Sequence, residues 1–399
     1  MRRDLFLVYL LFLAGCSTVP SKADPALLAG QIDKLLQTAV DQKKVPGAVA
    51  MVATRDGVVF EGAAALNKDA IFAIASMTKA VTSVAIMQLV EAGHVKVDEP
   101  ASTYVPELAQ IKVLADGQLR PPRNPITVRH LLTHTSGFSY EFMSPEIFGL
   151  VKQGKVASLL AGGDAFLQAP LLFDPGQRWE YGINTDWLGR LVERVSGQKL
   201  DAYFRAHILE PLAMNDTYFQ VPQEKSTRLA KLYQRKEDGS LVEQPMPPVA
   251  SGAFLSGGGG LFSTAADYIR FTQAIMNGGQ LSGKSILKPE TAALMQRNQI
   301  GALTIHPVRS VIPQLAKDKA VLPGALDKFG FGFALNSHPV ENGRAANTMA
   351  WAGIFNTFFW IDREKQVCAV LMTQMSPFLD DGAENLLRDV DRAVYFWLR

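Results

Sequence analysis

This sequence contains very little cysteine. Two cysteines, Cys16 and Cys368, occur among its 399 residues. Cys16 ends an N-terminal apolar segment, and Cys368 lies in the apolar run of residues 367–372. Such a run is typical of a buried strand, so we interpret Cys368 as a small core residue and not as a nucleophile. Without a second thiol in the folded part no intramolecular disulfide can form, and stability has to come from the core.

An excess of charge of one sign is also missing. The 40 Lys and Arg residues against 38 Asp and Glu residues give a net charge of +2, and no run is rich in Lys or Arg. We therefore expect no nucleic-acid partner. No segment repeats with a period of roughly 20–50 residues, which excludes solenoids and propellers. With 48% hydrophobic and 20% charged residues, the composition is that of a globular chain with a buried core.

The N-terminal apolar run, residues 5–13, is too short to cross a bilayer as a helix. It follows Arg2 and Arg3, and small residues come after it, which is the order found in a secretory signal. Its ending, Leu-Ala-Gly-Cys at residues 13–16, resembles a bacterial lipoprotein signal. The resemblance implies cleavage before Cys16, which leaves a diacylated N-terminal cysteine.

We therefore divide the chain into three segments. Residues 1–15 are predicted to be a signal peptide, residues 16–24 a polar tether, and residues 25–399 a single folded domain. The protein is then an exported bacterial lipoprotein on the periplasmic face of a membrane, which would be the outer membrane in a host with two membranes. An ordinary signal peptide with an incidental cysteine is the alternative interpretation.

The pattern of apolar residues predicts an α+β fold. Helical spacing, in several cases followed by glycine, predicts helices over residues 24–43, 76–92, 188–195, 265–276 and 383–398. Runs bounded by turn residues predict strands over residues 48–53, 58–63, 331–335, 357–361 and 367–373. Since few strands are evident between, we expect one antiparallel sheet from the N- and C-terminal segments, flanked by helices, with a mostly helical subdomain inserted over roughly residues 100–330. The chemistry is expected where this insertion meets the sheet.

The pattern Ser-x-x-Lys occurs three times, and two of the three instances read as structural. A serine and a lysine one turn apart on a helix share a face, so the amine can take the hydroxyl proton. The pair Ser196 and Lys199 lies where a helix stops at a glycine, and the pair Ser285 and Lys288 directly precedes a proline. Neither pair therefore lies on a continuing helix.

Ser76 and Lys79 form the third instance, at the start of a predicted apolar helix. A helix N-terminus favours developing negative charge and disfavours a charged amine, which suits a nucleophile and its base. A capping hydroxyl beside a solvated lysine is the structural alternative. No Gly-x-Ser-x-Gly occurs, which argues against the nucleophile elbow of α/β-hydrolases.

Two other patterns are interpreted as structural. His130 and His134 have a spacing that zinc ligands use, but the glutamate of His-Glu-x-x-His and a third ligand are not evident. The four glycines at residues 257–260 lack the strand, lysine and hydroxyl context of a phosphate loop, so we interpret them as a close-packed backbone crossing. No metal or cofactor is implied.

Several motifs stand in a defined order along the chain. They are Ser-Met-Thr-Lys at residues 76–79, Leu-Leu-Thr-His-Thr-Ser-Gly at 131–137, Pro-Gly-Gln-Arg-Trp-Glu-Tyr at 175–181, a Gly-rich segment at 256–267 and Trp-Ala-Gly at 351–353. Together they resemble the serine β-lactamase and penicillin-binding-protein superfamily over about residues 25–399. The third motif resembles the segment that presents the catalytic tyrosine of class C β-lactamases and family VIII carboxylesterases. The resemblance implies a β-lactamase-like fold and a catalytic role for Tyr181.

Two departures from class C β-lactamases shift the expected substrate. Their Tyr-x-Asn is Tyr181-Gly182-Ile183 here, although Asn184 one residue later is a partial substitute for the missing amide. Their Lys-Thr-Gly is replaced by a motif that begins with Trp351, which removes the cation that would hold a drug carboxylate and supplies an aromatic wall. Both departures favour neutral esters, as in family VIII carboxylesterases.

The sequence thus predicts a serine hydrolase, a carboxylesterase for small neutral esters, that forms an acyl-enzyme on Ser76. Lys79 and Tyr181 are predicted to move the proton as a coupled pair, and which of them is the formal base stays open. By resemblance, the backbone N–H groups of Ser76 and Ile354 hold the oxyanion. The substrate-binding residues are predicted to be Trp351, Ala352, Gly353, Ile354 and Asn184.

Three other functions stay open. They are a β-lactamase or D-Ala-D-Ala peptidase, an acyltransferase, and a non-catalytic binding lipoprotein. Phe138 and Tyr140 are interpreted as pocket-lining or as buried packing residues. The expected partners are a small-molecule ester and a membrane, through the lipid on Cys16.

Overall fold

The computed structural model describes residues 24–246, 254–307, 309–319 and 326–399. The predicted signal peptide, Cys16 and nearly all of the predicted tether lie outside these residues, so the predictions made for them stay predictions. Within the described ranges, no helix is both long and apolar enough to cross a membrane.

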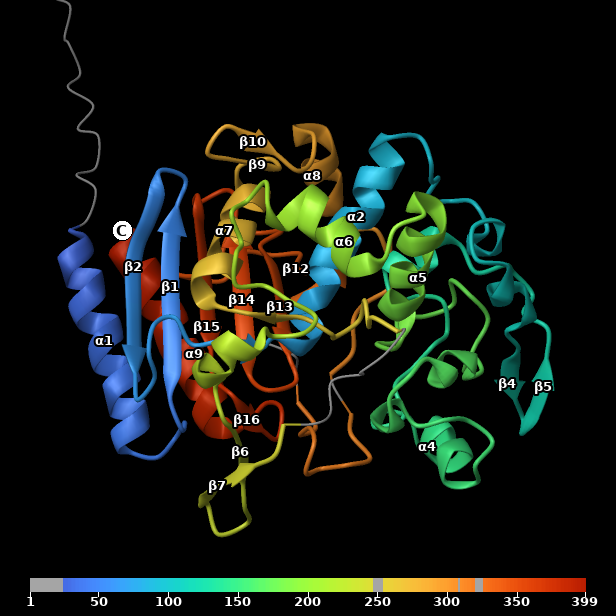
Figure 1. The fold of residues 1–399 in the computed structure, drawn as a ribbon, viewed down its shortest axis with the longest axis horizontal. Helices are drawn as coiled ribbons and strands as arrows, with labels where there is room; N and C mark the ends of the chain where they lie inside the picture. The colour runs from blue at the N-terminus through green and yellow to red at the C-terminus, as the bar shows by residue number, and fades with distance from the viewer. Residues whose placement is uncertain (1–23, 247–253, 308, 320–325) are drawn as a thin grey trace, which may run out of the picture.

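A seven-stranded antiparallel sheet forms one half of the molecule (Figure 1). Its order is β11-β12-β13-β14-β15-β1-β2, so an N-terminal hairpin joins a C-terminal meander. The junction pairs Val49 with Met372 and Thr54 with Val367. This confirms the predicted α+β architecture. The strands are β1 (Ala48–Thr54), β2 (Gly57–Ala64), β11 (Leu326–Phe329), β12 (Ala334–Asn336), β13 (Met349–Gly353), β14 (Thr357–Asp362) and β15 (Val367–Met372).

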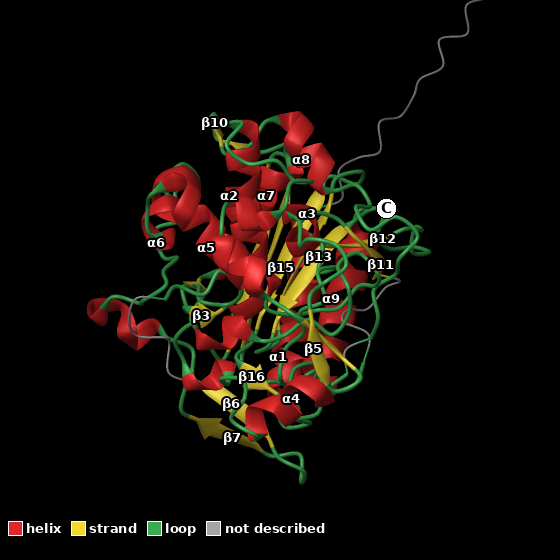
Figure 2. Cartoon of the chain, turned by 90° about the vertical axis from the view of Figure 1, so that its right-hand side faces the viewer, coloured by secondary structure: helices red, strands yellow, loops and turns green. Residues whose placement is uncertain are grey.

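Helices cover both faces of this sheet. On β14, Phe359 contacts Tyr268 of α7 at a ring distance of 5.3 Å, whereas the next residue, Trp360, faces Arg344, which pairs with Asp391 of α9. Since successive strand residues point to opposite faces, α7 and α9 lie on opposite sides (Figures 1 and 2). The α-helices are α1 (Pro25–Asp41), α2 (Thr78–Glu91), α3 (Val128–Leu132), α4 (Pro145–Lys152), α5 (Asn184–Ser196), α6 (Leu200–Phe204), α7 (Ala265–Met276), α8 (Pro289–Met295) and α9 (Asp381–Trp397).

The helix α2 runs through the interior and packs against α5. Residues 78–87 and Leu89 are buried, and apart from Lys79 their side chains are apolar or small, as burial on all sides of a helix requires. It ends at Glu91, one residue before the predicted end, and Gly93 follows in the left-handed region at φ +75°. α5 ends at Ser196 with Gly197 as its C-cap, close to the predicted end at residue 195, but it begins at Asn184 and not at residue 188. α7 lies within the range predicted for the insertion, yet it packs on the sheet.

The strand predicted over residues 331–335 begins too early, since only residues 334 and 335 belong to β12. Residues 331–333 connect β11 to β12, and Gly332 adopts φ +90° with its backbone against Ser83 of α2. Two phenylalanines around this glycine gave the segment an alternating pattern, but they belong to a turn. Residues 351–353 precede the strand predicted over 357–361, and they lie in a strand of their own, β13.

The prediction of few strands between residues 100 and 330 needs a similar correction. Several short strands lie there, each paired with only one or two others, and their apolar runs are too short to give a clear period. Outside the large sheet the described strands are β3 (Phe72–Ala73), β4 (Val113–Ala115), β5 (Gln118–Arg120), β6 (Leu232–Arg235), β7 (Leu241–Gln244), β8 (Phe262–Ser263), β9 (Gln280–Leu281), β10 (Lys284–Ser285) and β16 (Met375–Ser376).

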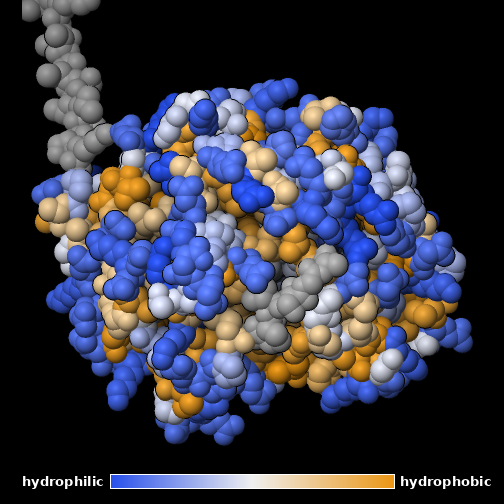
Figure 3. All heavy atoms as spheres, viewed as in Figure 1, coloured by the Kyte–Doolittle hydropathy of each residue, from blue (hydrophilic) through white to orange (hydrophobic). Residues whose placement is uncertain are grey.

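The face seen in Figure 3 is mostly hydrophilic, with apolar side chains gathered below its centre.

Candidate active site

Ser76 lies in a short 3-10 turn, Ala75–Met77, that leads directly into α2. Ala75 holds φ +43°, a left-handed conformation that is unfavourable for a residue with a side chain. Strain of this kind persists where the surrounding structure enforces it, and it is concentrated at functional sites. The turn leaves the Ser76 side chain partly exposed, facing a cavity.

The Lys79 amine is buried and fully engaged. The side chain is 2% exposed. Its Nζ lies 2.6 Å from the carbonyl oxygen of Gly258, 2.8 Å from the hydroxyl of Tyr140 and 3.3 Å from Oγ of Ser76. The predicted pairing of Ser76 with Lys79 is therefore present in the fold, at the first turn of α2.

Asp186 supplies a buried negative charge behind this amine. Its side chain, 1% exposed, accepts hydrogen bonds from Oγ of Ser256 at 2.6 Å and from the N–H of Gly258 at 3.0 Å. Burial raises the pKa of Asp186, while the positive charge of Lys79 and these hydrogen bonds lower it. Gly258 thus links the two charges, since its N–H donates to Asp186 and its carbonyl accepts from Lys79.

The glycine segment 257–260 is a close-packed crossing, as predicted. A Cβ on Gly258 would lie 2.4 Å from Oδ2 of Asp186, and one on Gly257 would lie 2.7 Å from the carbonyl oxygen of Thr185. The absence of side chains lets this backbone reach both α5 and Lys79. The contact with Lys79 could not be predicted from the sequence, because nothing in the glycine segment indicates which amine its carbonyl oxygen meets.

Tyr140 is the functional residue that sequence reasoning missed. It was interpreted as a lining or packing residue, but its hydroxyl is the 2.8 Å partner of Lys79. Burial first, and then the neighbouring Tyr181 and Asp186, raise the pKa of Tyr140 well above its ordinary value, so the hydroxyl keeps its proton. Its position shortly after the motif at residues 131–137 is the one signal that could have found it.

Tyr181 meets Lys79 through its ring. The amine lies 4.9 Å from the ring centroid, a cation–π distance. The ring packs against His134 at 4.9 Å, Trp351 at 5.0 Å and Tyr140 at 5.2 Å. Within the described ranges, its buried hydroxyl has no hydrogen-bond partner. That hydroxyl is therefore available to a bound molecule.

The predicted motif at residues 351–353 closes the site from the sheet. A Cβ on Gly353 would lie 2.3 Å from the carbonyl oxygen of Ile74, so glycine is what allows β13 to approach the turn that carries Ser76. Trp351, Ala352 and Ile354 line the same cavity as Ser76. Three segments far apart in the sequence thus meet at one nucleophile.

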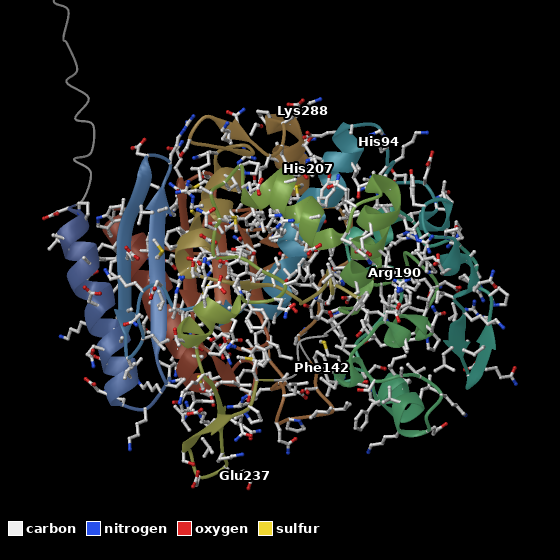
Figure 4. All side chains as sticks on the ribbon, viewed as in Figure 1. His94, Phe142, Arg190, His207, Glu237 and Lys288 are labelled. Carbon is white, nitrogen blue, oxygen red and sulfur yellow. The ribbon has the colours of Figure 1, made fainter. Side chains whose placement is uncertain are left out.

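The cavity beside Ser76, the first cavity, has a volume of about 30 Å³. In the part of the chain that the structure describes, no lysine or arginine lines it. Figure 4 labels one wall residue, Phe142, which lies between the sheet and α4 in this view. The lining residues are Ser76, Phe142, Met143, Trp179, Tyr181, His306, Ala316, Trp351, Ala352, Ile354 and Phe378.

Comparison with known proteins agrees with this arrangement. The profile of the β-lactamase family matches residues 32–393. The chain belongs to the β-lactamase family. Monacolin J acid methylbutanoyltransferase from Aspergillus terreus is 29% identical, with 94% of this chain and 96% of that protein covered. Esterase EstB from Burkholderia gladioli is also 29% identical, with 88% and 91% covered.

A solved structure supports the β-lactamase-like fold. Unliganded simvastatin synthase (LovD) from Aspergillus terreus matches with a TM-score of 0.78 at 29% identity, and the match covers 94% of this chain and 98% of that chain. The relatives of this chain therefore include an acyltransferase and an esterase.

One predicted site residue of this β-lactamase-family chain has a different role. Asn184 was assigned to substrate binding, but its side chain is fully buried and does not line the first cavity. Its amide nitrogen meets Nδ1 of His134 at 2.8 Å, and its carbonyl oxygen accepts from the Ser136 hydroxyl. Asn184 instead fixes the loop at residues 133–137 to the start of α5.

The two histidines and the other Ser-x-x-Lys serines are held by structural contacts. Burial, and then the charge of Lys79, lower the pKa of His134, so its ring stays neutral. Nδ1 of His130 accepts from the N–H of Thr127 in a capping box. Ser196 and Ser285 donate to carbonyl oxygens of their own segments. Among the described residues, no group of three possible metal ligands occurs.

Proposed function

We propose that this protein is a serine carboxylesterase that cleaves neutral esters through an acyl-enzyme on Ser76. The observation that carries the proposal is the 3.3 Å contact between Oγ of Ser76 and the buried amine of Lys79, at the edge of an apolar cavity. A serine hydroxyl next to a desolvated amine is the arrangement that activates a nucleophile.

The three contacts of Lys79 suit a neutral amine as base. A neutral amine has two N–H groups and one lone pair. The N–H groups can donate to the carbonyl of Gly258 and to the oxygen of Tyr140, while the lone pair accepts the proton of Ser76. Tyr140 would therefore orient the amine and leave its lone pair directed at the nucleophile.

In the first half-reaction Oγ of Ser76 bonds to the ester carbonyl carbon, and its proton passes to the Lys79 and Tyr181 pair. The backbone N–H groups of Ser76 and Ile354 stabilise the oxyanion. When the tetrahedral intermediate collapses, the bond to the alkoxide breaks and the same pair returns the proton to the leaving alcohol. Water then adds to the acyl-enzyme, and its proton follows the same route before the acid leaves.

A neutral substrate is supported by the lining of the first cavity. Trp351 and the other aromatic residues offer apolar contacts, and among the described residues no lysine or arginine lines the cavity to hold a carboxylate. A lost charge-assisted contact lowers the affinity for an anionic ligand by about 1.5–3 kcal/mol, or roughly ten- to a hundredfold. β-Lactamase or D-Ala-peptidase activity should therefore be weak, which nitrocefin hydrolysis can measure.

Acyl transfer to an alcohol is the second candidate, and the full-length similarity to a methylbutanoyltransferase favours it. The acyl-enzyme would be the same, with an alcohol in place of water in the second half-reaction. Product analysis with increasing alcohol distinguishes the two functions, since a transferase yields a new ester in preference to the free acid.

We also propose that the chain acts as an exported lipoprotein, held at a membrane by the lipid on Cys16. The signal-like residues 1–15 support this, together with the Cys at the end of the segment. A catalytic domain on a short tether would then act on esters close to the membrane surface.

The deciding experiment compares the initial rate of p-nitrophenyl butyrate hydrolysis by the full chain and by Ser76→Ala. We expect turnover that the substitution abolishes, and an acyl adduct on Ser76 in mass spectra of the quenched reaction. Near-normal turnover in Ser76→Ala would refute the mechanism. Ligand binding without Ser76-dependent turnover would favour a binding lipoprotein.

A further inference from the structure

A second cavity adjoins the nucleophile. Ser76 and Ile354 line the first cavity, whereas their chain neighbours, Ala75 and Phe355, line the second. Among the described residues the two cavities have no lining residue in common. Their walls are therefore next to each other in the chain at two places, the turn that carries Ser76 and the backbone position proposed to hold the oxyanion.

The side chains that line the second cavity are apolar apart from that of Ser256. The cavity has a volume of about 180 Å³. Phe166 and Phe254 form an edge-to-face pair in its wall, and Leu160 is 57% exposed although it lines the cavity. Ser256 is the one polar side chain among the described lining residues, and its hydroxyl is bonded to Asp186.

No charged side chain of the described residues lines this cavity. The hydroxyl of Ser256 is already satisfied, so the side chains of the lining offer a ligand little beyond apolar contact. A charged ligand would lose its hydration there without a charged side chain to pair with, which is unfavourable. The ligand that fits is a hydrocarbon chain.

Proton transfer decides which half of the ester enters each cavity. The leaving alcohol oxygen has to lie beside the proton donors, and Tyr181, with its unpartnered hydroxyl, lines the first cavity. The alcohol therefore belongs there.

Gly259 lines the second cavity close to Ala75, the neighbour of Ser76. A Cβ on Gly259 would lie 3.8 Å from the carbonyl carbon of Ala75 and would meet nothing nearer.

We propose that the second cavity binds the acyl chain, so that the preferred substrates are esters of medium-chain apolar carboxylic acids. This inference rests on the proposed function of Ser76. It adds a subsite and a substrate class that the catalytic residues by themselves do not define.

The experiment uses p-nitrophenyl esters with acyl chains of two to ten carbons and the full chain, so that the leaving group stays constant. In the parent protein kcat/KM should rise about fourfold for each added methylene until the cavity is filled, which corresponds to about 0.8 kcal/mol per methylene. Gly259→Val places a branched side chain at the junction and should lower the octanoate-to-acetate ratio of kcat/KM at least tenfold.

Two further variants keep the test decisive. Leu160→Glu, at an exposed position, puts a charge at the second cavity and should lower the same ratio, even if Gly259→Val folds poorly. Met143→Trp narrows the first cavity and should reduce kcat/KM for all chain lengths alike, which leaves the ratio unchanged.

The outcomes separate this inference from the function on which it rests. A flat dependence on chain length in the parent protein would overturn the inference. So would a fall in the ratio for Met143→Trp without one for Gly259→Val and Leu160→Glu, because the chain would then occupy the first cavity. In both cases the protein still shows turnover that depends on Ser76. If no ester is turned over in a Ser76-dependent way, the proposed function itself has failed.

Discussion

Nζ of Lys79 lies 2.8 Å from the hydroxyl of Tyr140, a residue 61 positions further along the chain. This contact determines the orientation of the amine toward Ser76, since the other strong partner of the amine is a fixed backbone carbonyl, that of Gly258. Tyr140 is thus a positioning residue for the proposed base.

The substitution Tyr140→Phe removes the hydroxyl and keeps the ring, which stacks on Phe142 at 5.0 Å. A hydrogen bond to a charged or strongly polar group contributes about 1.5–3 kcal/mol, so kcat should fall roughly ten- to a hundredfold with little change in KM. Steady-state kinetics on p-nitrophenyl butyrate will show this.

The matched control for Tyr140→Phe is Tyr395→Phe, which removes a buried hydroxyl bonded to Asp362 on the α9 side of the sheet. It should lower the unfolding temperature and leave kcat unchanged. Equal activity of Tyr140→Phe and the parent protein would contradict the positioning role.

Asp186→Asn tests the buried charge pair while preserving the shape of the side chain. Burial raises the pKa of Asp186, while the charge of Lys79 and the hydrogen bonds of the carboxylate lower it. His134, Tyr140 and Tyr181 are the other titratable groups that face Lys79. Because the parent carboxylate becomes protonated as the pH falls through this pKa, whereas asparagine is neutral at every pH, the part of the acid limb of the kcat/KM profile that reflects Asp186 should be missing from Asp186→Asn.

Asp267→Asn is the control for this pH profile. Asp267 is a buried carboxyl whose pKa is raised by burial, and it bonds Thr217 and the backbone of Asp216 instead of the site. Its profile should match the parent's. An Asp186→Asn profile with the same acid limb as the parent protein would show that the charge of Asp186 does not contribute to the pH dependence.

Gly353→Ala should damage both stability and catalysis. The added methyl would lie 2.3 Å from the carbonyl oxygen of Ile74 and 2.4 Å from Oγ1 of Thr357, so β13 has to move away from the turn that carries Ser76. Overpacking of this kind costs about 1–3 kcal/mol of unfolding free energy. We expect a loss of activity of at least tenfold, since the N–H of Ile354 moves with the strand.

A second Gly→Ala substitution, at a position with space for the methyl group, is the control for Gly353→Ala. Gly30 lies within α1 and has nothing within 4 Å of its Cβ position, so Gly30→Ala should stabilise the protein by about 0.5–1 kcal/mol. Denaturant unfolding measures both variants. Full activity in Gly353→Ala would remove the support for an oxyanion donor at Ile354.

Cys16→Ala should release the protein from membranes. In the parent protein, mass spectra of the N-terminal fragment should show cleavage before Cys16 and a diacylated thiol. Cys368→Ala is the control, because that thiol is buried in β15 and its pKa is raised to about 12 by burial. A Cys16→Ala protein that stays in the membrane fraction would refute lipid anchoring.

Local patterns determined the parts of the fold that depend on local physics. The spacing of Ser76 and Lys79 predicts proximity, because residues three apart share one face of a helix. The period of the apolar residues predicts the hairpin of β1 and β2 and the helices α1, α7 and α9, because one face of each is buried. The resemblance added Tyr181 and the motif at residues 351–353.

Only the tertiary structure could decide the contacts between segments. Asn184 looked free to bind a ligand, but folding buries it between His134 and Ser136. Tyr140 and Asp186 meet around Lys79, and the second of these acts through the backbone of Gly258. The sequence around a side chain does not show which residue far along the chain will contact it. The distances in space between Lys79 and these partners are set by the packing of α2, α5 and the glycine segment. The sequence thus determined which groups could react, and the packing decided which of them surround the amine.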